Sequence, residues 1–247
     1  MNKLVARFLS LPIFCSAVLY GAVVSGMAVS GAATAATVED DPYRVVQHTT
    51  EQVLDIIKGA KADYKKDPRK FNQQVMVLLE EVIDFDKFAR GVMGRYASAQ
   101  QYKSLESTAE KTALKQQIKS FSTTFKRGIV DTYAKGLFDF KGQNVKTLPS
   151  RKGDDVSSGA VTVIQNVYNA SGKPYVIQYS MRRTKGGEWK LNNLIVEGIN
   201  LGLTYRNQFA VSADRYKGDI DKVIANWQVD PKAAVLKSNA LKQESIN

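Results

Sequence analysis

Apolar residues recur at three- and four-residue steps through the first half of the chain, which is the spacing of one face of a helix. Pro42 and Pro68 stand where two such stripes begin, and Asp84 is a suitable N-cap for a third. The pattern predicts four helices, at about 42–57, 68–82, 85–96 and 106–140. Each has an apolar face and a polar face, so each needs a partner surface.

From about residue 143 the apolar period changes from 3.6 to 2, which is typical of strands. Alternation runs from Val161 to Val167 and through PYVIQYSMRR (174–183), and the turn residues 185–187 lead into a strand predicted at 188–196. Short strands joined by tight turns predict an antiparallel meander with one face covered by the earlier helices. The helical period returns after Gly198, at about 201–210 and 219–227. The fold class is therefore α+β.

The first 36 residues have the composition of an export signal. Lys3 and Arg7 precede a long apolar run, and small residues up to Ala36 follow it. Cleavage near Ala35 or Ala36 satisfies the pattern that signal peptidase reads, which predicts a periplasmic protein. The alternative is an uncleaved membrane anchor. The predicted organisation is a signal peptide at 1–36, one domain at 37–228 and a polar, flexible tail at 229–247.

Loss of the signal peptide would leave 33 basic and 24 acidic residues, a net charge of +9 that favours anionic partners. It would also remove Cys15, the single cysteine of the chain. No disulfide, cysteine nucleophile or cysteine-ligated metal is then available. The single histidine, His48, has no matching carboxylate motif, and Asp84 with Asp86 fits helix capping better than acid–base chemistry. These observations do not favour an enzyme.

The segment LIVEGINLGLTYRNQF (194–209) places Gly198 and Gly202 between a strand and a helix. Neither the glycine spacing nor the residues that follow match a Rossmann loop or a P-loop. We interpret the glycines as joints: Gly198 allows a bend, and Gly202 lets the next helix lie close to the sheet.

Large apolar side chains line the helices and face a sheet rich in Tyr, Ile and Met. Such stripes are typical of a core, but they could equally line a cavity for an apolar ligand. Periodicity alone does not separate these two interpretations.

Four stretches resemble the periplasmic phospholipid-binding proteins of the Mla pathway, the toluene-tolerance family. They are VIDFDKFARGVMGRY (82–96), FSTTFKRGIVDTYAKGL (121–137), GEWKLNNLIVEGINLGLTYRNQF (187–209) and GDIDKVIANW (218–227). Their order and spacing extend the resemblance over nearly the whole chain after the signal peptide.

The resemblance implies a sheet similar to that of nuclear-transport-factor-like domains, with a deep hydrophobic cavity between the sheet and the helices. It implies a soluble carrier that holds phospholipid acyl chains and exchanges lipid with two partners. These are an inner-membrane ABC transporter complex and an outer-membrane lipoprotein–porin complex. The resemblance implies no catalysis, cofactor or metal.

Inward-facing positions of the matching segments are the predicted lipid-binding residues: Phe88, Val92, Met93, Phe121, Phe125, Ile129, Tyr133, Ile177, Tyr179, Met181, Leu194, Val196, Ile199 and Tyr205. Three arginines are candidate headgroup or partner contacts: Arg182, Arg183 and Arg206.

Three alternatives stay open at this point. The chain could be an exported enzyme on a similar scaffold, a carrier of another apolar cargo such as hopanoids, or an envelope adaptor without a ligand. An enzyme would need ionisable groups inside the cavity, and the predicted wall offers almost none.

Overall fold

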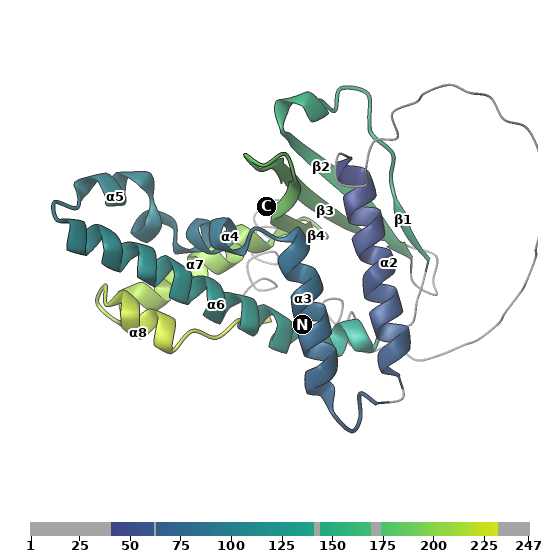
Figure 1. Cartoon of the computed structure of the whole chain (residues 1–247), viewed down its shortest axis with the longest axis horizontal. Coiled ribbons are helices and arrows are strands. Elements are labelled where there is room, and N and C mark those ends of the chain that lie inside the picture. Colours follow the sequence, from purple (N-terminus) through teal and green to yellow (C-terminus); the bar gives the residue numbers. More distant parts are fainter. Residues whose placement is uncertain (1–40, 62, 141–143, 169–173, 232–247) are drawn as a thin grey trace, which may run out of the picture.

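One helix crosses one face of a five-stranded sheet, and further helices extend beyond one edge of that sheet (Figure 1). This computed structural model describes residues 41–61, 63–140, 144–168 and 174–231. The predicted signal peptide and residues 232–247 of the predicted tail lie outside the described residues. None of the helices in these ranges is long and apolar enough to cross a membrane.

All but one of the described helices begin close to where the sequence predicts. They are α2 (Pro42–Ala60), α3 (Pro68–Val82), α4 (Phe85–Met93), α5 (Ala99–Ser104), α6 (Thr108–Phe138), α7 (Leu201–Arg215) and α8 (Ile220–Ala225). Carboxylates cap the first three: Asp41 accepts from the Tyr43 amide, Asp67 from the Arg69 amide and Asp84 from the Lys87 amide. Asp84 therefore has the capping role that its position predicts.

Two helical predictions need correction. The third helix ends at Met93 rather than near Tyr96, because Gly94 has a φ of 57° and a 3-10 turn, η2 (Gly94–Ala97), follows. The short helix α5 was not predicted. It separates η2 from α6, which starts behind a capping box formed by Ser107 and Glu110.

The predicted meander is confirmed. The strands are β1 (Val145–Thr147), β2 (Ala160–Tyr168), β3 (Pro174–Arg183), β4 (Trp189–Val196) and β5 (Ile199–Asn200), in the order β1-β2-β3-β4-β5 with antiparallel pairing throughout. The register between β3 and β4 shifts between Ser180 and Met181. On the far side of β4, Ile83 forms a parallel bridge with Leu191, so the start of α4 is fixed at this edge.

The two faces of the sheet differ most clearly on β2, where burial alternates along the strand. On β2 the buried residues alternate, from Val161 to Val167, and their partners on β3 include Tyr179 and Met181. We call this the inner face. Helix α2 lies on it, because Val46 packs in one buried cluster with side chains from β2, β3 and β4. The alternate residues form the outer face.

Among the described residues, buried apolar side chains form three clusters. A helical cluster joins α4, α6, α7 and α8. A sheet cluster joins the start of α2 to the inner face at Val161, Val163 and Met181. A corner cluster joins the end of α2 to α3 and the last turns of α6. Helix α6 therefore changes partners along its length, from Phe121 and Phe125 in the helical cluster to Val130 in the corner cluster.

Gly198 and Gly202 are the joints that the sequence predicts. Glu197 and Gly198 form the two-residue turn from β4 to β5, and both have positive φ, 51° and 79°. A Cβ on Gly202 would lie 2.5 Å from Oδ1 of Asn193, the atom that accepts the Gly202 amide hydrogen bond. Helix α7 therefore starts closer to β4 than a side chain at residue 202 would allow without a shift of Asn193.

We expect Gly202→Ala to lower the free energy of unfolding by about 1–3 kcal/mol, because the new methyl group must displace Asn193. Chemical denaturation measures the change. Gly59→Ala is the matched control, since a Cβ there meets nothing within 4 Å and should raise stability by about 0.5–1 kcal/mol. Equal stability of Gly202→Ala and the wild-type protein would contradict the role of this joint.

Candidate functional site

The inner face of β3, β4 and β5 carries apolar side chains that the helices do not fully cover. Ile177 pairs with Val196, which pairs in turn with Ile199, and Tyr179 pairs with Leu194. All five are partly exposed. Within the described ranges, only Tyr179 of the five packs against one of the three buried clusters. We call these five residues the inner apolar wall.

The helical residues predicted to contact lipid have a different environment. Val92, Met93, Phe121, Phe125 and Tyr205 are at most 1% exposed and belong to the helical cluster. Their rings pack edge to face, with 5.4 Å between the ring centroids of Phe125 and Tyr205. In this structure they form a core, which is the first of the two interpretations that periodicity allowed.

Three other helical residues lie at the border of that core. Phe88, Ile129 and Tyr133 are partly exposed and pack against the helical cluster. The Tyr133 and Tyr205 hydroxyls share a hydrogen bond of 2.7 Å, and burial raises the pKa of both phenols. Both therefore stay neutral at ordinary pH, and the pair satisfies two polar atoms in an apolar setting.

A buried polar network lies beside the inner apolar wall. The Tyr179 hydroxyl donates to Oε1 of Gln165 (2.8 Å), and Nε2 of Gln165 donates to the Thr50 and Thr147 hydroxyls (2.9 and 3.1 Å). Burial raises the pKa of Tyr179, so its hydroxyl remains a donor. The network ties α2 to three strands. Sequence analysis missed Gln165, although it interrupts the valines of the β2 alternation.

The three predicted arginines lie apart. Arg182 is on the outer face, so its side chain points to the opposite side of the sheet from the inner apolar wall. Arg183 lies over the Trp189 ring, 5.2 Å from its centroid. Arg206 donates through Nε to the Gly91 carbonyl oxygen (2.8 Å), which joins α7 to α4. They do not form one anion site.

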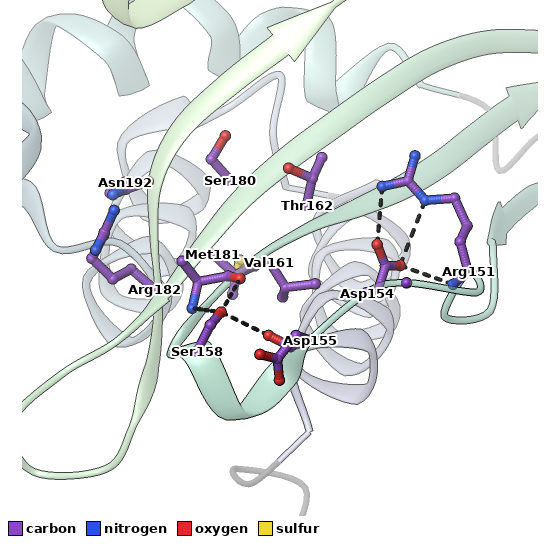
Figure 2. A pocket seen from close by; sticks show the side chains of 12 residues that line it. Arg151, Asp154, Asp155, Ser158, Val161, Thr162, Ser180, Met181, Arg182 and Asn192 are labelled. Atoms are coloured by element: carbon purple, nitrogen blue, oxygen red, sulfur yellow. Dashed lines mark hydrogen bonds and ion pairs between the residues drawn. The ribbon is translucent and has the colours of Figure 1, made fainter.

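A pocket of about 410 Å³ is lined by residues of the 151–162 segment, by Ser180, Met181 and Arg182 of β3 and by Asn192 of β4. Figure 2 shows these lining side chains, of which Thr162, Ser180 and Arg182 belong to the outer face. A second pocket, of about 320 Å³, lies where α2 and α3 meet, around Tyr64 and Phe71. Apart from Met181, the predicted lipid-binding residues line neither pocket.

Of the five residues of the inner apolar wall, Tyr179 alone has a titratable side chain. His48 is exposed and lies 3.9 Å from Glu51 on the same helix. The described parts of the chain contain no group of three or more His, Cys, Asp or Glu residues placed to hold a metal ion.

A family model described as MlaC protein matches residues 47–229. The chain belongs to the MlaC protein family. It is 32% identical over 186 residues to the toluene tolerance protein ttg2D of Pseudomonas putida, covering 75% of this chain and 79% of that protein. The resemblance stated from the sequence is therefore confirmed.

The chain is also similar to a protein whose structure was solved with a bound ligand. The phospholipid-binding protein from Ralstonia solanacearum, solved in complex with a phospholipid, matches with a TM-score of 0.57 and 25% identity. The match covers 75% of this chain and 93% of that one. That relative therefore holds a phospholipid on a similar α+β fold.

Helix α2 is fixed over the inner face at its first turn as well as through Thr50. The Tyr43 hydroxyl donates to Oδ2 of Asp154 (2.6 Å), in the segment before β2. This hydrogen bond is the main cause that lowers the pKa of Asp154 to about 2. Because the folded pKa lies below the ordinary carboxyl value, the contact stabilises the fold above about pH 4 and is lost as pH falls toward about 2.

We expect Tyr43→Phe to raise the pKa of Asp154 toward 3.8, its ordinary value. NMR of the Asp154 carboxyl carbon between about pH 5 and pH 2 measures this. Tyr64→Phe is the control, because Tyr64 stacks on Phe138 and its hydroxyl has no hydrogen-bond partner among the described residues. A pKa that stays at about 2 in Tyr43→Phe would show that other groups hold Asp154.

Proposed function

We propose that this chain is a soluble periplasmic carrier that holds the acyl chains of a phospholipid against the inner apolar wall. The observation that carries the proposal is the incomplete cover of this wall. Its side chains are apolar, in register across three strands, and partly exposed. The partly exposed helical residues Phe88, Ile129 and Tyr133 are proposed to complete the site.

The helical cluster and the sheet cluster are separate, which supports binding of the acyl chains at the inner apolar wall. The helical cluster has its own aromatic core, and the sheet cluster closes one end of the inner face. Each part can therefore stay folded while acyl chains occupy the space next to the wall. A single continuous core would instead have to be opened before a ligand could enter.

The energetics favour recognition of the tails over the headgroup. Two acyl chains contain about 30 methylenes, each worth about 0.8 kcal/mol when buried, so hiding half of them contributes on the order of 10 kcal/mol. One arginine–phosphate hydrogen bond contributes about 1.5–3 kcal/mol. We therefore expect weak headgroup discrimination and no catalysis.

Membership of the MlaC family supports a role in lipid exchange. We propose that the carrier moves phospholipid between an outer-membrane lipoprotein–porin complex and an inner-membrane ABC transporter complex with its substrate-binding ring, and so contributes to outer-membrane lipid asymmetry. The proposed +9 charge of the processed chain suits docking on acidic partner surfaces.

A pair of adjacent substitutions on β4 tests the wall. We expect Leu194→Gln to weaken binding of a fluorescent fatty-acyl probe by about tenfold, because it places an amide among buried methylenes. Ile195→Gln is the matched control: Ile195 is also partly exposed but faces the other side of the sheet. Equal effects of the two substitutions would contradict binding on the inner face.

The cargo is identified by organic extraction of the purified protein followed by mass spectrometry. We expect phospholipids with mixed headgroups. A hopanoid would replace the proposed cargo, and protein that carries no lipid and takes up no acyl probe would end the carrier proposal.

A further inference from the structure

The pocket on the outer face has a different chemistry from the inner apolar wall. It is bordered by the 151–159 segment, by the first residues of β2 and by the last residues of β3 (Figure 2). Because side chains alternate along a strand, its floor residues Thr162, Ser180 and Arg182 point away from the wall. The two surfaces lie on opposite sides of the sheet.

Four polar side chains line this pocket without bonding to one another. Thr162 and Ser180 are cross-strand partners, and Arg182 follows two residues along β3. The register shift between β3 and β4 leaves Asn192 without a partner on β3, and Asn192 lines the same pocket as Arg182 (Figure 2). None of these four side chains makes a hydrogen bond or ion pair with another residue of the described ranges.

The carboxylates of the pocket are already engaged. Asp154 accepts hydrogen bonds from Tyr43 and from the Arg151 amide (2.8 Å), and it forms an ion pair with the Arg151 guanidinium (3.2 Å). Asp155 accepts hydrogen bonds from the Ser157 amide (2.9 Å) and from the Ser157 hydroxyl (2.5 Å). The side chains left to bind a ligand are therefore those of Arg182, Ser180, Thr162 and Asn192. Each of them can donate hydrogen bonds.

A planar guanidinium with two hydroxyls and an amide suits a tetrahedral oxyanion. The guanidinium can donate two parallel hydrogen bonds to phosphate oxygens, and the neutral groups can donate to the others. Together these donors can make several directed hydrogen bonds to one phosphate. A single surface cation cannot do so.

We propose that this outer-face pocket binds a phosphate group through Arg182, Ser180, Thr162 and Asn192. The site is separate from the proposed acyl site and goes beyond the carrier function. The phosphate can come from free inorganic phosphate or from a lipid headgroup at a membrane surface, and the two sources share this chemistry.

Inorganic phosphate tests the first source. The full processed chain is titrated at constant ionic strength while amide NMR signals are followed. We expect saturable shifts at Thr162, Ser180 and Asn192, and affinity at least about fivefold lower in Arg182→Gln. Lys185→Gln is the matched control, because it removes one exposed positive charge three residues away, in the turn after β3.

Vesicles test the second source. Co-sedimentation with phosphatidylcholine vesicles that contain phosphatidic acid should fall several-fold in Arg182→Gln and much less in Lys185→Gln. The site is supported if the protein binds inorganic phosphate, the vesicles or both, and if Arg182→Gln loses that binding while Lys185→Gln keeps it. The ligand that binds then identifies the source of the phosphate. Absence of saturable binding in both experiments, or equal loss in the two variants, overturns the site.

Uptake of the fatty-acyl probe separates this proposal from the carrier function. Arg182→Gln should take up the probe like the wild-type protein, since it lies across the sheet from the wall. Phosphate binding without acyl uptake would refute only the carrier function, and acyl uptake without phosphate binding would refute only the outer pocket.

Discussion

An amphipathic sheet has one apolar face that must be removed from water, and the helices of this chain cover that face only in part. Helix α2 closes the end near β1 and β2, where Val161 and Val163 are buried. The aromatic residues of α4, α6 and α7 pack with one another instead of spreading over β3 and β4. The apolar wall that remains on β3, β4 and β5 is the surface on which the proposed function depends.

Polar contacts hold the covering helix in place where apolar burial is limited. Thr50 reaches Gln165 and, through it, Tyr179 and Thr147, while Tyr43 reaches Asp154 at the first turn. Hydrogen bonds are directional, so they fix the position of α2 along the strands more narrowly than apolar packing alone. The helix can therefore border a binding surface without sliding across it.

Alternation along the strands gives one sheet two unrelated surfaces. Tyr179 and Leu194 face the helices, while their neighbours Ser180 and Ile195 face the other way. The proposed acyl chains on the inner face and the proposed phosphate on the outer face would thus be separated only by the thickness of the sheet. The register shift after Ser180 adds Asn192 to the polar side.

Residues close along the chain were enough to predict the capped helix starts, the antiparallel meander and the two glycine joints, because each of these depends on near neighbours. The order of the motifs was enough to predict the family. Contacts formed in the folded chain settled which apolar stripe became core and which stayed partly open. Phe125 and Leu194 have equally apolar patterns, but Phe125 meets Tyr205 from α7, whereas Leu194 belongs to none of the buried clusters within the described ranges. Such contacts join residues far apart in the chain, and periodicity carries no information about them.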